Sequence, residues 1–408
     1  MDLEMFGIAS PGNLVPIAGV DPRGGSWHHR AFLPSPLANE EPALLAATYR
    51  QVARTRAALA ALDSTARQLP NPGLLRRPTL NREAQSTSAL EGTYAPLSDV
   101  LVEDLDDPSS VEVREILNYV VMAEYAFSWM QSGGPLNVGL LADLQAMLVR
   151  RTPGEGPSSG RIRDVQVVIG HRPDAPPSAL PIHASRFVPS PPGPDLEARV
   201  RDLLSWIGQG GIEEVDPVVA AAVAHYQFES LHPFHDGNGR LGRLLVVLQL
   251  LLTGVLSEPT LTVSPWFESR RSEYYDRLFA VSTEGAWDAW VHFFAAGLEQ
   301  SARDTHQQLQ RLLAVQDELK ERVRASPLRA DNALKLVDVS VARPSFTARQ
   351  VEADLAISYA RANGLIAQLV ELGILEPVRK STNYDRRFRA PRIHAVLLDP
   401  GPGSSVWR

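Results

Sequence analysis

The residues best suited to chemistry lie together between two apolar segments, in the run 231–243 with the sequence LHPFHDGNGRLGR. It brings a histidine, a carboxylate, a Gly-Asn-Gly turn and two arginines to the junction of two predicted helices. Glycine permits positive φ angles, and the free amides at the start of a helix favour an anion. Arg240 and Arg243 lie one turn apart on that helix. Because cations oppose the dipole there, the run predicts a polyanionic phosphate site with a base beside it.

The side chains of this run suit different steps of one reaction. His232 can accept a proton at neutral pH, since an ordinary imidazole has a pKa of about 6.5, and a protein hydroxyl needs such a base to attack phosphorus. Asp236 is a hard oxygen ligand suited to a Mg²⁺ ion held mainly by nucleotide phosphates. Phe234 reads as the apolar anchor of the loop. The predicted phosphate-binding residues are Gly237, Asn238, Gly239, Arg240 and Arg243, of which Arg240 can bind bidentately.

The histidines of the region admit a second interpretation, a metal site made of His225, His232 and His235 with Asp236. Pro233 and the glycines interrupt the regular helix that such a cluster would need. This favours the phosphate site over the metal site.

The run also matches, at every defining position, the HPFx(D/N/E)GNGRxxR signature of the Fic family, and the chain resembles that family. The resemblance implies an enzyme that transfers AMP from ATP to a Ser, Thr or Tyr hydroxyl of a target protein. It implies that His232 deprotonates this hydroxyl, that Asp236 holds Mg²⁺, and that Arg240 and Arg243 bind the β and γ phosphates. His235 occupies the variable position of the signature and inherits no role.

A second segment, 87–92 with the sequence TSALEG, resembles the inhibitory helix of the same family. The resemblance implies that Glu91 pairs with Arg243 and blocks the productive position of the γ-phosphate. The local chemistry agrees, because Glu91 lies at the last turn of a helix that we expect to begin near Thr79, with Gly92 as its C-cap. A carboxylate at that end opposes the helix dipole and should have a cationic partner.

Between these segments, residues 161–170 alternate and are rich in β-branched side chains, which predicts a strand. The Pro-rich segment 171–194 follows. The resemblance implies a flap, a β-hairpin that binds the target segment by strand pairing; a surface hairpin that closes a helical core is the alternative. By analogy, the aromatic helix around Tyr275 supplies the adenine pocket.

The last eighty residues read as a separate unit. Helices are expected to begin near Thr347 and at Tyr359, and a strand follows from Gly373. The basic segment 379–389 completes an order that resembles a winged helix, with its wing near Asn383. Winged helices bind DNA or protein. Because only Arg361 is cationic on the expected recognition helix, protein binding is favoured over DNA binding.

Length and composition set the outer limits. A chain of 408 residues predicts two or three domains, which we place at 1–105 (N-terminal helical region with the inhibitory motif), 106–326 (Fic core with flap) and 327–408 (winged helix). The fold class is mainly α, a helical bundle with one small hairpin, and residues 1–38 are expected to be irregular. With no cysteine and no signal-peptide pattern, we expect a soluble, cytoplasmic protein that makes no use of a membrane.

The functions weighed are therefore three. The first is a protein adenylyltransferase using ATP and Mg²⁺, autoinhibited by Glu91 and also able to remove AMP. The second is a Doc-like protein kinase that binds ATP in the reverse orientation. The third is a nucleotide-sensing DNA-binding regulator. The sequence also leaves open whether the chain forms a homodimer. The complete signature together with Glu91 favours the first.

Overall fold

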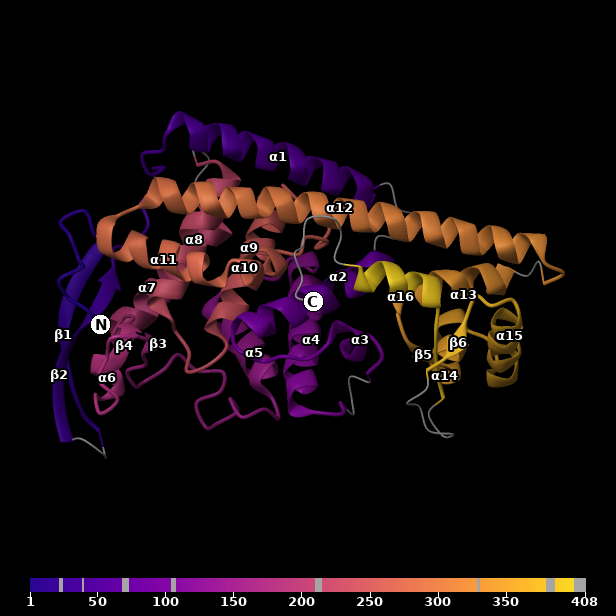
Figure 1. Ribbon diagram of the computed structural model, residues 1–408, viewed down its shortest axis with the longest axis horizontal. Helices are drawn as coiled ribbons and strands as arrows, with labels where there is room; N and C mark the ends of the chain where they lie inside the picture. The colour runs from indigo at the N-terminus through magenta and orange to yellow at the C-terminus, as the bar shows by residue number, and fades with distance from the viewer. Residues whose placement is uncertain are drawn as a thin grey trace. The chain divides into compact units, whose positions relative to one another are not determined.

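Helices dominate the computed structural model of the chain, which describes residues 1–21, 25–38, 40–67, 73–103, 108–209, 215–328, 331–378 and 386–399. Within these ranges, three small antiparallel sheets accompany the helices (Figure 1). This confirms the prediction of a mainly α fold, although the described residues form more β-structure than the one small hairpin that was predicted. None of the described helices combines the length and apolar character that crossing a membrane requires.

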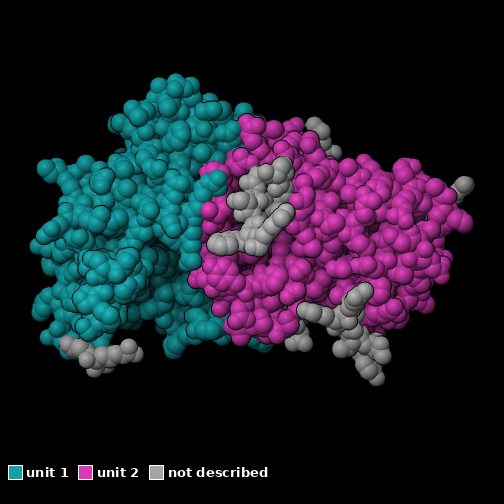
Figure 2. Space-filling view, viewed as in Figure 1, with its two compact units in different colours: residues 1–57, 121–255, 270–299 teal, residues 58–120, 256–269, 300–408 magenta. Residues whose placement is uncertain are grey.

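The chain forms two compact units, drawn in different colours in Figure 2. Three long helices contribute to both units: α1 (Ala46–Arg67), α4 (Val111–Gln131) and α12 (Trp287–Ala325). The division into 1–105, 106–326 and 327–408 stays a prediction. Unit 1 comprises Met1–Ala57, Val121–Val255 and Arg270–Glu299, and unit 2 comprises Ala58–Val120, Leu256–Ser269 and Gln300–Arg408.

Unit 1 is built around two consecutive helices, α8 (Pro217–Leu231) and α9 (Asn238–Leu252), which pack against each other. Both are buried nearly all round, as is typical of central helices. The start of α8 is well defined, because Asp216 accepts a hydrogen bond from the Val218 amide at 2.8 Å and Pro217 occupies the first helical position.

Two further helices support this pair. The helix α7 (Pro194–Gly208) contacts both α8 and α9, and α5 (Val138–Val149) contacts α7. The α7 side chains that face the core recur at helical spacing, and burying each contributes about 1.5–3 kcal/mol. They are Leu196, Val200, Leu203, Leu204 and Ile207.

The N-terminal segment forms a regular hairpin, so the prediction of irregular structure over residues 1–38 is wrong. Strands β1 (Gly12–Asp21) and β2 (Gly25–Pro34) pair antiparallel over their whole length. Pro16 lies inside β1, where it is tolerated because a strand of a two-stranded sheet is an edge strand. The segment has few β-branched residues, and its order comes from packing: Phe32 is fully buried and its amide donates to the Val188 carbonyl at 2.9 Å.

The second hairpin of unit 1 is shorter than the sequence predicts. Strands β3 (Ile169–His171) and β4 (Ser185–Phe187) pair antiparallel, with the short helix α6 (Pro181–Ala184) between them. Residues 161–168 are not a strand. Their backbone groups are used elsewhere, since the Arg163 amide donates to the Pro233 carbonyl at 2.9 Å.

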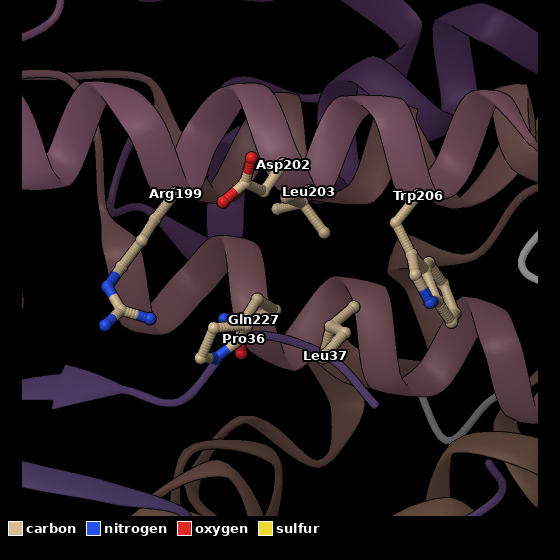
Figure 3. Close-up of a pocket in the computed structure, with 7 residues that line it drawn as sticks. All are labelled: Pro36, Leu37, Arg199, Asp202, Leu203, Trp206 and Gln227. Atoms are coloured by element: carbon tan, nitrogen blue, oxygen red, sulfur yellow. The ribbon is translucent and has the colours of Figure 1, made fainter. Parts of the chain in front are cut away.

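A small cavity of about 50 Å³ lies between α7, α8 and the segment that follows β2 (Figure 3). Two of its lining residues bind that segment: Arg199 donates to the Pro34 carbonyl at 2.7 Å and Gln227 to the Ser35 carbonyl at 2.9 Å. These contacts fix the first hairpin to the core helices. The lining residues are Pro36, Leu37, Arg199, Asp202, Leu203, Trp206 and Gln227, none of which belongs to the run 231–243.

In unit 2, the helix α2 (Gly73–Leu90) begins six residues earlier than predicted and includes Pro78. It packs against α10 (Ser264–Ser269) and α13 (Asp331–Ala342). The buried Glu83 accepts hydrogen bonds from the backbone amides of Val263 and Ser264 at 2.8 and 2.9 Å, which caps α10. The predicted cap at the end of α2 is confirmed, because Gly92 has a φ of 99°. The short α3 (Leu97–Val100) follows.

The C-terminal part of unit 2 contains the two predicted helices, as α14 (Ala348–Leu355) and α15 (Tyr359–Glu371). Three short strands form a sheet in the order β5-β7-β6, followed by α16 (Pro391–Leu398). The elements follow the order expected of a winged helix, and that assignment stays a prediction. The expected wing near Asn383 lies outside the described residues. The strands are β5 (Phe346–Thr347), β6 (Glu376–Pro377) and β7 (Arg387–Arg389).

Candidate active site

The loop between α8 and α9 begins at His232, which ends α8 in the left-handed conformation. Its φ is 50° and its amide donates to the Phe228 carbonyl at 2.9 Å. Such a conformation costs a non-glycine residue on the order of 1–3 kcal/mol and persists only where the surroundings impose it. The side chain is half-buried. His232 is therefore held in an unfavourable conformation while its imidazole keeps access to solvent.

A buried arginine, Arg163, supports this turn. It lies in the segment 161–170, which was predicted to be a strand. Arg163 is 1% exposed, and its Nε donates to the His232 carbonyl at 2.8 Å. Burial lowers the pKa of the Arg163 guanidinium to about 10, so it remains cationic at neutral pH. Its position among the apolar and β-branched residues of the segment 161–170 gave no signal that separated it from Arg161, a second arginine two residues earlier.

Asp236 lies at the tip of the loop, with its side chain 44% exposed. Its Oδ1 accepts hydrogen bonds from the Gly237 amide at 2.6 Å and from the buried Arg240 guanidinium at 2.9 Å. The Asp236 carbonyl accepts from Gln145 Nε2 at 3.1 Å, and Gln145 Oε1 accepts from the Gly160 amide at 2.6 Å. Gln145 thus ties the loop to the segment that follows α5.

The donor set at this position fits a magnesium ion bound mainly to phosphates. Mg²⁺ is usually held in such sites by one or two carboxylates together with phosphate and water oxygens. Asp236 supplies one carboxylate, already oriented through Oδ1 and partly open to solvent. It is the residue of the loop that would hold the ion.

Asn238, a predicted phosphate-binding residue, also closes the loop through its side chain. Its Oδ1 accepts from the Phe234 amide at 2.9 Å, and its Nδ2 donates to the Phe234 carbonyl at 2.8 Å. Both ends of the amide therefore hold the loop closed over the buried Phe234 ring. Gly237 has a φ of 87°, and a Cβ there would lie 2.7 Å from Leu148 Cδ2, so only glycine fits.

The two arginines of the signature lie in the first turns of α9, and both are buried, as is Gly239 between them and the loop. Burial first, and the positive charge of Arg243 second, lower the pKa of His225 to about 3. His225 Nε2 is 2.7 Å from the Tyr274 hydroxyl, and its ring stacks on Trp290. His225 is accordingly neutral and part of an aromatic core.

This placement does not support the alternative metal site. Within the described ranges there is no group of three or more His, Cys, Asp or Glu side chains placed to hold a metal ion. His225 is directed to Tyr274, and His235 lies 3.9 Å from the exposed Asp164. The histidines of the region thus serve separate contacts.

Comparison with known proteins identifies matches to one family. Residues 135–250 match the Fic/DOC family. The chain carries a Fic/DOC domain. Residues 49–128 match the N-terminal region of the same family. A crystal structure of a Fic family protein from Desulfovibrio desulfuricans G20 shares the fold, with a TM-score of 0.51 at 22% identity over 86% of this chain and 97% of that one.

Two relatives are named protein adenylyltransferases. The fic-1 protein of Caenorhabditis elegans is 32% identical over 143 residues, which are 35% of this chain and 24% of that protein. The Fic protein of Aedes aegypti is 37% identical over 112 residues, 27% of this chain and 21% of that protein. The chain thus spans about a quarter of the length of these relatives.

The hairpin β3–β4, which stays a predicted flap, is anchored at its base. Arg186 of β4 forms an ion pair with Asp276 of α11 (Arg271–Glu284) and lies over the Phe279 ring. On the other side, Gln166 Nε2 donates to the carbonyls of Val167 and Pro189 at 2.9 and 3.0 Å. These contacts hold the two ends of this hairpin together.

Two further residues with predicted roles are Tyr275 and Glu91. Tyr274 is fully buried against His225, whereas Tyr275 is partly exposed with its ring 5.0 Å from that of Tyr274. The adenine contact of Tyr275 stays a prediction. Glu91 follows the last residue of α2 in unit 2 and is exposed. Its pairing with Arg243, a residue of unit 1, also stays a prediction.

We expect Gly154→Ala to impair the Fic loop through Asp236. A Cβ on Gly154 would lie 2.1 Å from Asp236 Oδ2, closer than real Cβ contacts allow, so the carboxylate must move. The variant should need a higher Mg²⁺ concentration for half-maximal nucleotide transfer. Gly156→Ala, where a Cβ meets nothing within 4 Å, is the matched control. An unchanged Mg²⁺ dependence in Gly154→Ala would refute this role for Asp236.

The buried His225 predicts acid sensitivity of the fold. Its pKa in the folded protein, about 3, lies below the ordinary value of 6.5, so between these values the unfolded chain binds more protons. The free energy of unfolding should therefore decrease as the pH is lowered through this window, by on the order of 2 kcal/mol between pH 7 and pH 5. Urea titrations should show a smaller loss in His225→Gln; an equal loss would contradict the assignment.

Proposed function

We propose that this chain is a protein adenylyltransferase that transfers AMP from ATP to a Ser, Thr or Tyr hydroxyl of a target protein. The observation that carries the proposal is the segment 232–243, where a half-buried histidine in the loop and two buried arginines in the first turns of α9 lie at one helix junction. The names of the relatives support the same activity. ATP is the substrate nucleotide.

The proposed reaction is an in-line displacement. The target hydroxyl oxygen forms a bond to the α-phosphorus of ATP, and the bond from that phosphorus to the bridging oxygen breaks. Pyrophosphate leaves, and the hydroxyl proton passes to the imidazole of His232. Such a base typically contributes about 10²- to 10⁴-fold in rate. In support of this role, His232 is half-buried and ends α8 in the left-handed conformation.

The remaining loop residues bind and orient the nucleotide. Arg240 and Arg243 would neutralise the β and γ phosphates with guanidinium groups that burial keeps poorly hydrated. The amides that follow Gly237 lie at the N-terminus of α9, where anions are favoured. Mg²⁺, which Asp236 would hold, supplies further neutralisation of the phosphates. Holding the reactants in line lowers the barrier through proximity.

The target protein would be bound at the flap. An edge strand offers backbone amides and carbonyls to an extended peptide, and β3 and β4 make a two-stranded sheet whose base is fixed by Arg186 and Gln166. Strand addition there would position a target hydroxyl through backbone hydrogen bonds. Such pairing would not select the side chains that flank the modified residue.

Regulation by Glu91 completes the proposal. A carboxylate that pairs with Arg243 would compete with the γ-phosphate for the same guanidinium, so ATP would bind in an unproductive pose. The same carboxylate could position water for removal of AMP from a modified target.

The C-terminal segment is proposed to bind protein rather than DNA. Two arginines of its basic stretch serve the fold: Arg387 is buried and donates to Ser345 Oγ at 3.2 Å, and Arg389 pairs with Glu376. Arg361 is the one cation of α15.

Absence of cysteine fits a reducing cytoplasm.

Incubation with ATP labelled at the α- or the γ-phosphate tests the proposal. AMP transfer incorporates the α label alone, whereas a Doc-like kinase incorporates the γ label.

A further inference from the structure

The buried guanidinium of Arg163 joins three parts of unit 1. Its Nη1 donates to the Val165 carbonyl at 3.0 Å, just before the flap, and its Nη2 donates to the Ser190 carbonyl, just after it. Its Nε donates to the His232 carbonyl at 2.8 Å, and Nη2 also lies 3.3 Å from the Leu231 carbonyl. One side chain thus contacts both ends of the flap and the turn that bears the base.

The backbone of Arg163 adds a contact of the same kind. Its amide donates to the Pro233 carbonyl at 2.9 Å, so three successive carbonyls, those of residues 231 to 233, accept hydrogen bonds from this one residue. The last carbonyls of a helix have no partner within it, and a cation at that end is favoured by the dipole. Arg163 therefore supplies both requirements at the end of α8.

These contacts add to the hydrogen bond from the His232 amide to the Phe228 carbonyl in imposing the conformation of the turn. A left-handed residue directs its carbonyl away from the helical ladder, and here that carbonyl is bound by Arg163 Nε. The orientation of the backbone at His232 in turn sets the direction of the imidazole.

We propose that Arg163 is a positioning residue for His232, and that it couples the placement of the flap to the orientation of this base. Its effect on turnover rests on the proposed function, but its effect on the imidazole does not. Arginine is required rather than any cation, because the planar fork has five donors in fixed directions, whereas lysine offers one compact ammonium.

The first arm of the test follows the His232 imidazole itself by NMR in the full chain. Its resonances are identified by their loss in His232→Ala and titrated in wild type, Arg163→Gln and Arg163→Lys. We expect both Arg163 variants to shift these resonances and to change the titration midpoint. Arg161→Gln, which removes an exposed arginine two residues away, should match wild type. Unchanged His232 resonances in a folded Arg163 variant would overturn the proposal.

The second arm measures transfer from ATP. Arg163→Gln should lower kcat by about 10- to 100-fold, as expected of a misplaced catalytic group, and leave the KM for ATP within about twofold. Because Arg163 acts through His232, adding Arg163→Gln to His232→Ala should cost nothing further. Additive losses would overturn the proposal.

Two outcomes keep the tests separate. A wild-type protein that transfers no AMP to any substrate would refute the proposed function, while the NMR arm would still decide the role of Arg163. If circular dichroism shows that Arg163→Gln does not fold, Arg163→Lys, which keeps the charge, carries both arms.

Discussion

Glu91→Gly should raise automodification and target labelling with ATP well above the wild-type level. If Arg243 binds either the Glu91 carboxylate or the γ-phosphate, removing the carboxylate frees the guanidinium for the productive pose. A hydrogen bond between charged groups contributes about 1.5–3 kcal/mol, which corresponds to roughly a ten- to hundredfold gain in rate. ATP affinity should change less than turnover, because the contacts with adenine and with the other phosphates persist.

A matched control for this variant exists in the same unit. Glu371 is the exposed last residue of α15 and lies two residues before a glycine with positive φ. It is thus a second glutamate at a helix end, but no contact with Arg243 is predicted for it. Glu371→Gly should leave transfer unchanged. A Glu91→Gly protein that folds and binds ATP but is no more active than wild type would make Glu91 an ordinary helix-end residue.

The second large effect concerns the base. His232→Ala should reduce AMP transfer by about 10²- to 10⁴-fold, while the affinity for Mg-ATP stays within severalfold, since the imidazole handles the proton and not the phosphates. Rates are best compared in the Glu91→Gly background, where the starting activity is expected to be high. Isothermal titration gives the affinity for the nucleotide.

His235→Ala is the control for the base. This histidine is three residues further along, is exposed, and occupies the variable position of the signature. Its loss should leave transfer nearly unchanged. Labelling by His232→Ala at near wild-type rates would show that another group takes the proton.

The local patterns of the sequence predicted the elements that carry the loop. Apolar stretches flanking the run 231–243 indicated α8 and α9, and the glycine after Glu91 indicated the end of α2. The two predicted helices of the C-terminal segment begin at the side-chain caps Thr347 and Ser358. Such features depend on neighbours within a few residues, so one sequence is enough to find them.

The misses depend on contacts between residues distant in the chain. The hairpin β1–β2 is ordered by Phe32 packing near Val188, which no local pattern reveals. Arg163 gains its role only when folding brings residues 163, 190 and 232 together.

The most direct test of the central claim is mass spectrometry of the Glu91→Gly protein, with its modified peptides, after incubation with Mg²⁺ and ATP labelled at either the α- or the γ-phosphate. The proposed function predicts an added AMP group on a Ser, Thr or Tyr hydroxyl. The modified peptide should retain the α label, whereas the γ label should leave with pyrophosphate. The Glu91→Gly, His232→Ala double variant should show no such modification. Incorporation of the γ label as a single phosphate would contradict it and identify a kinase.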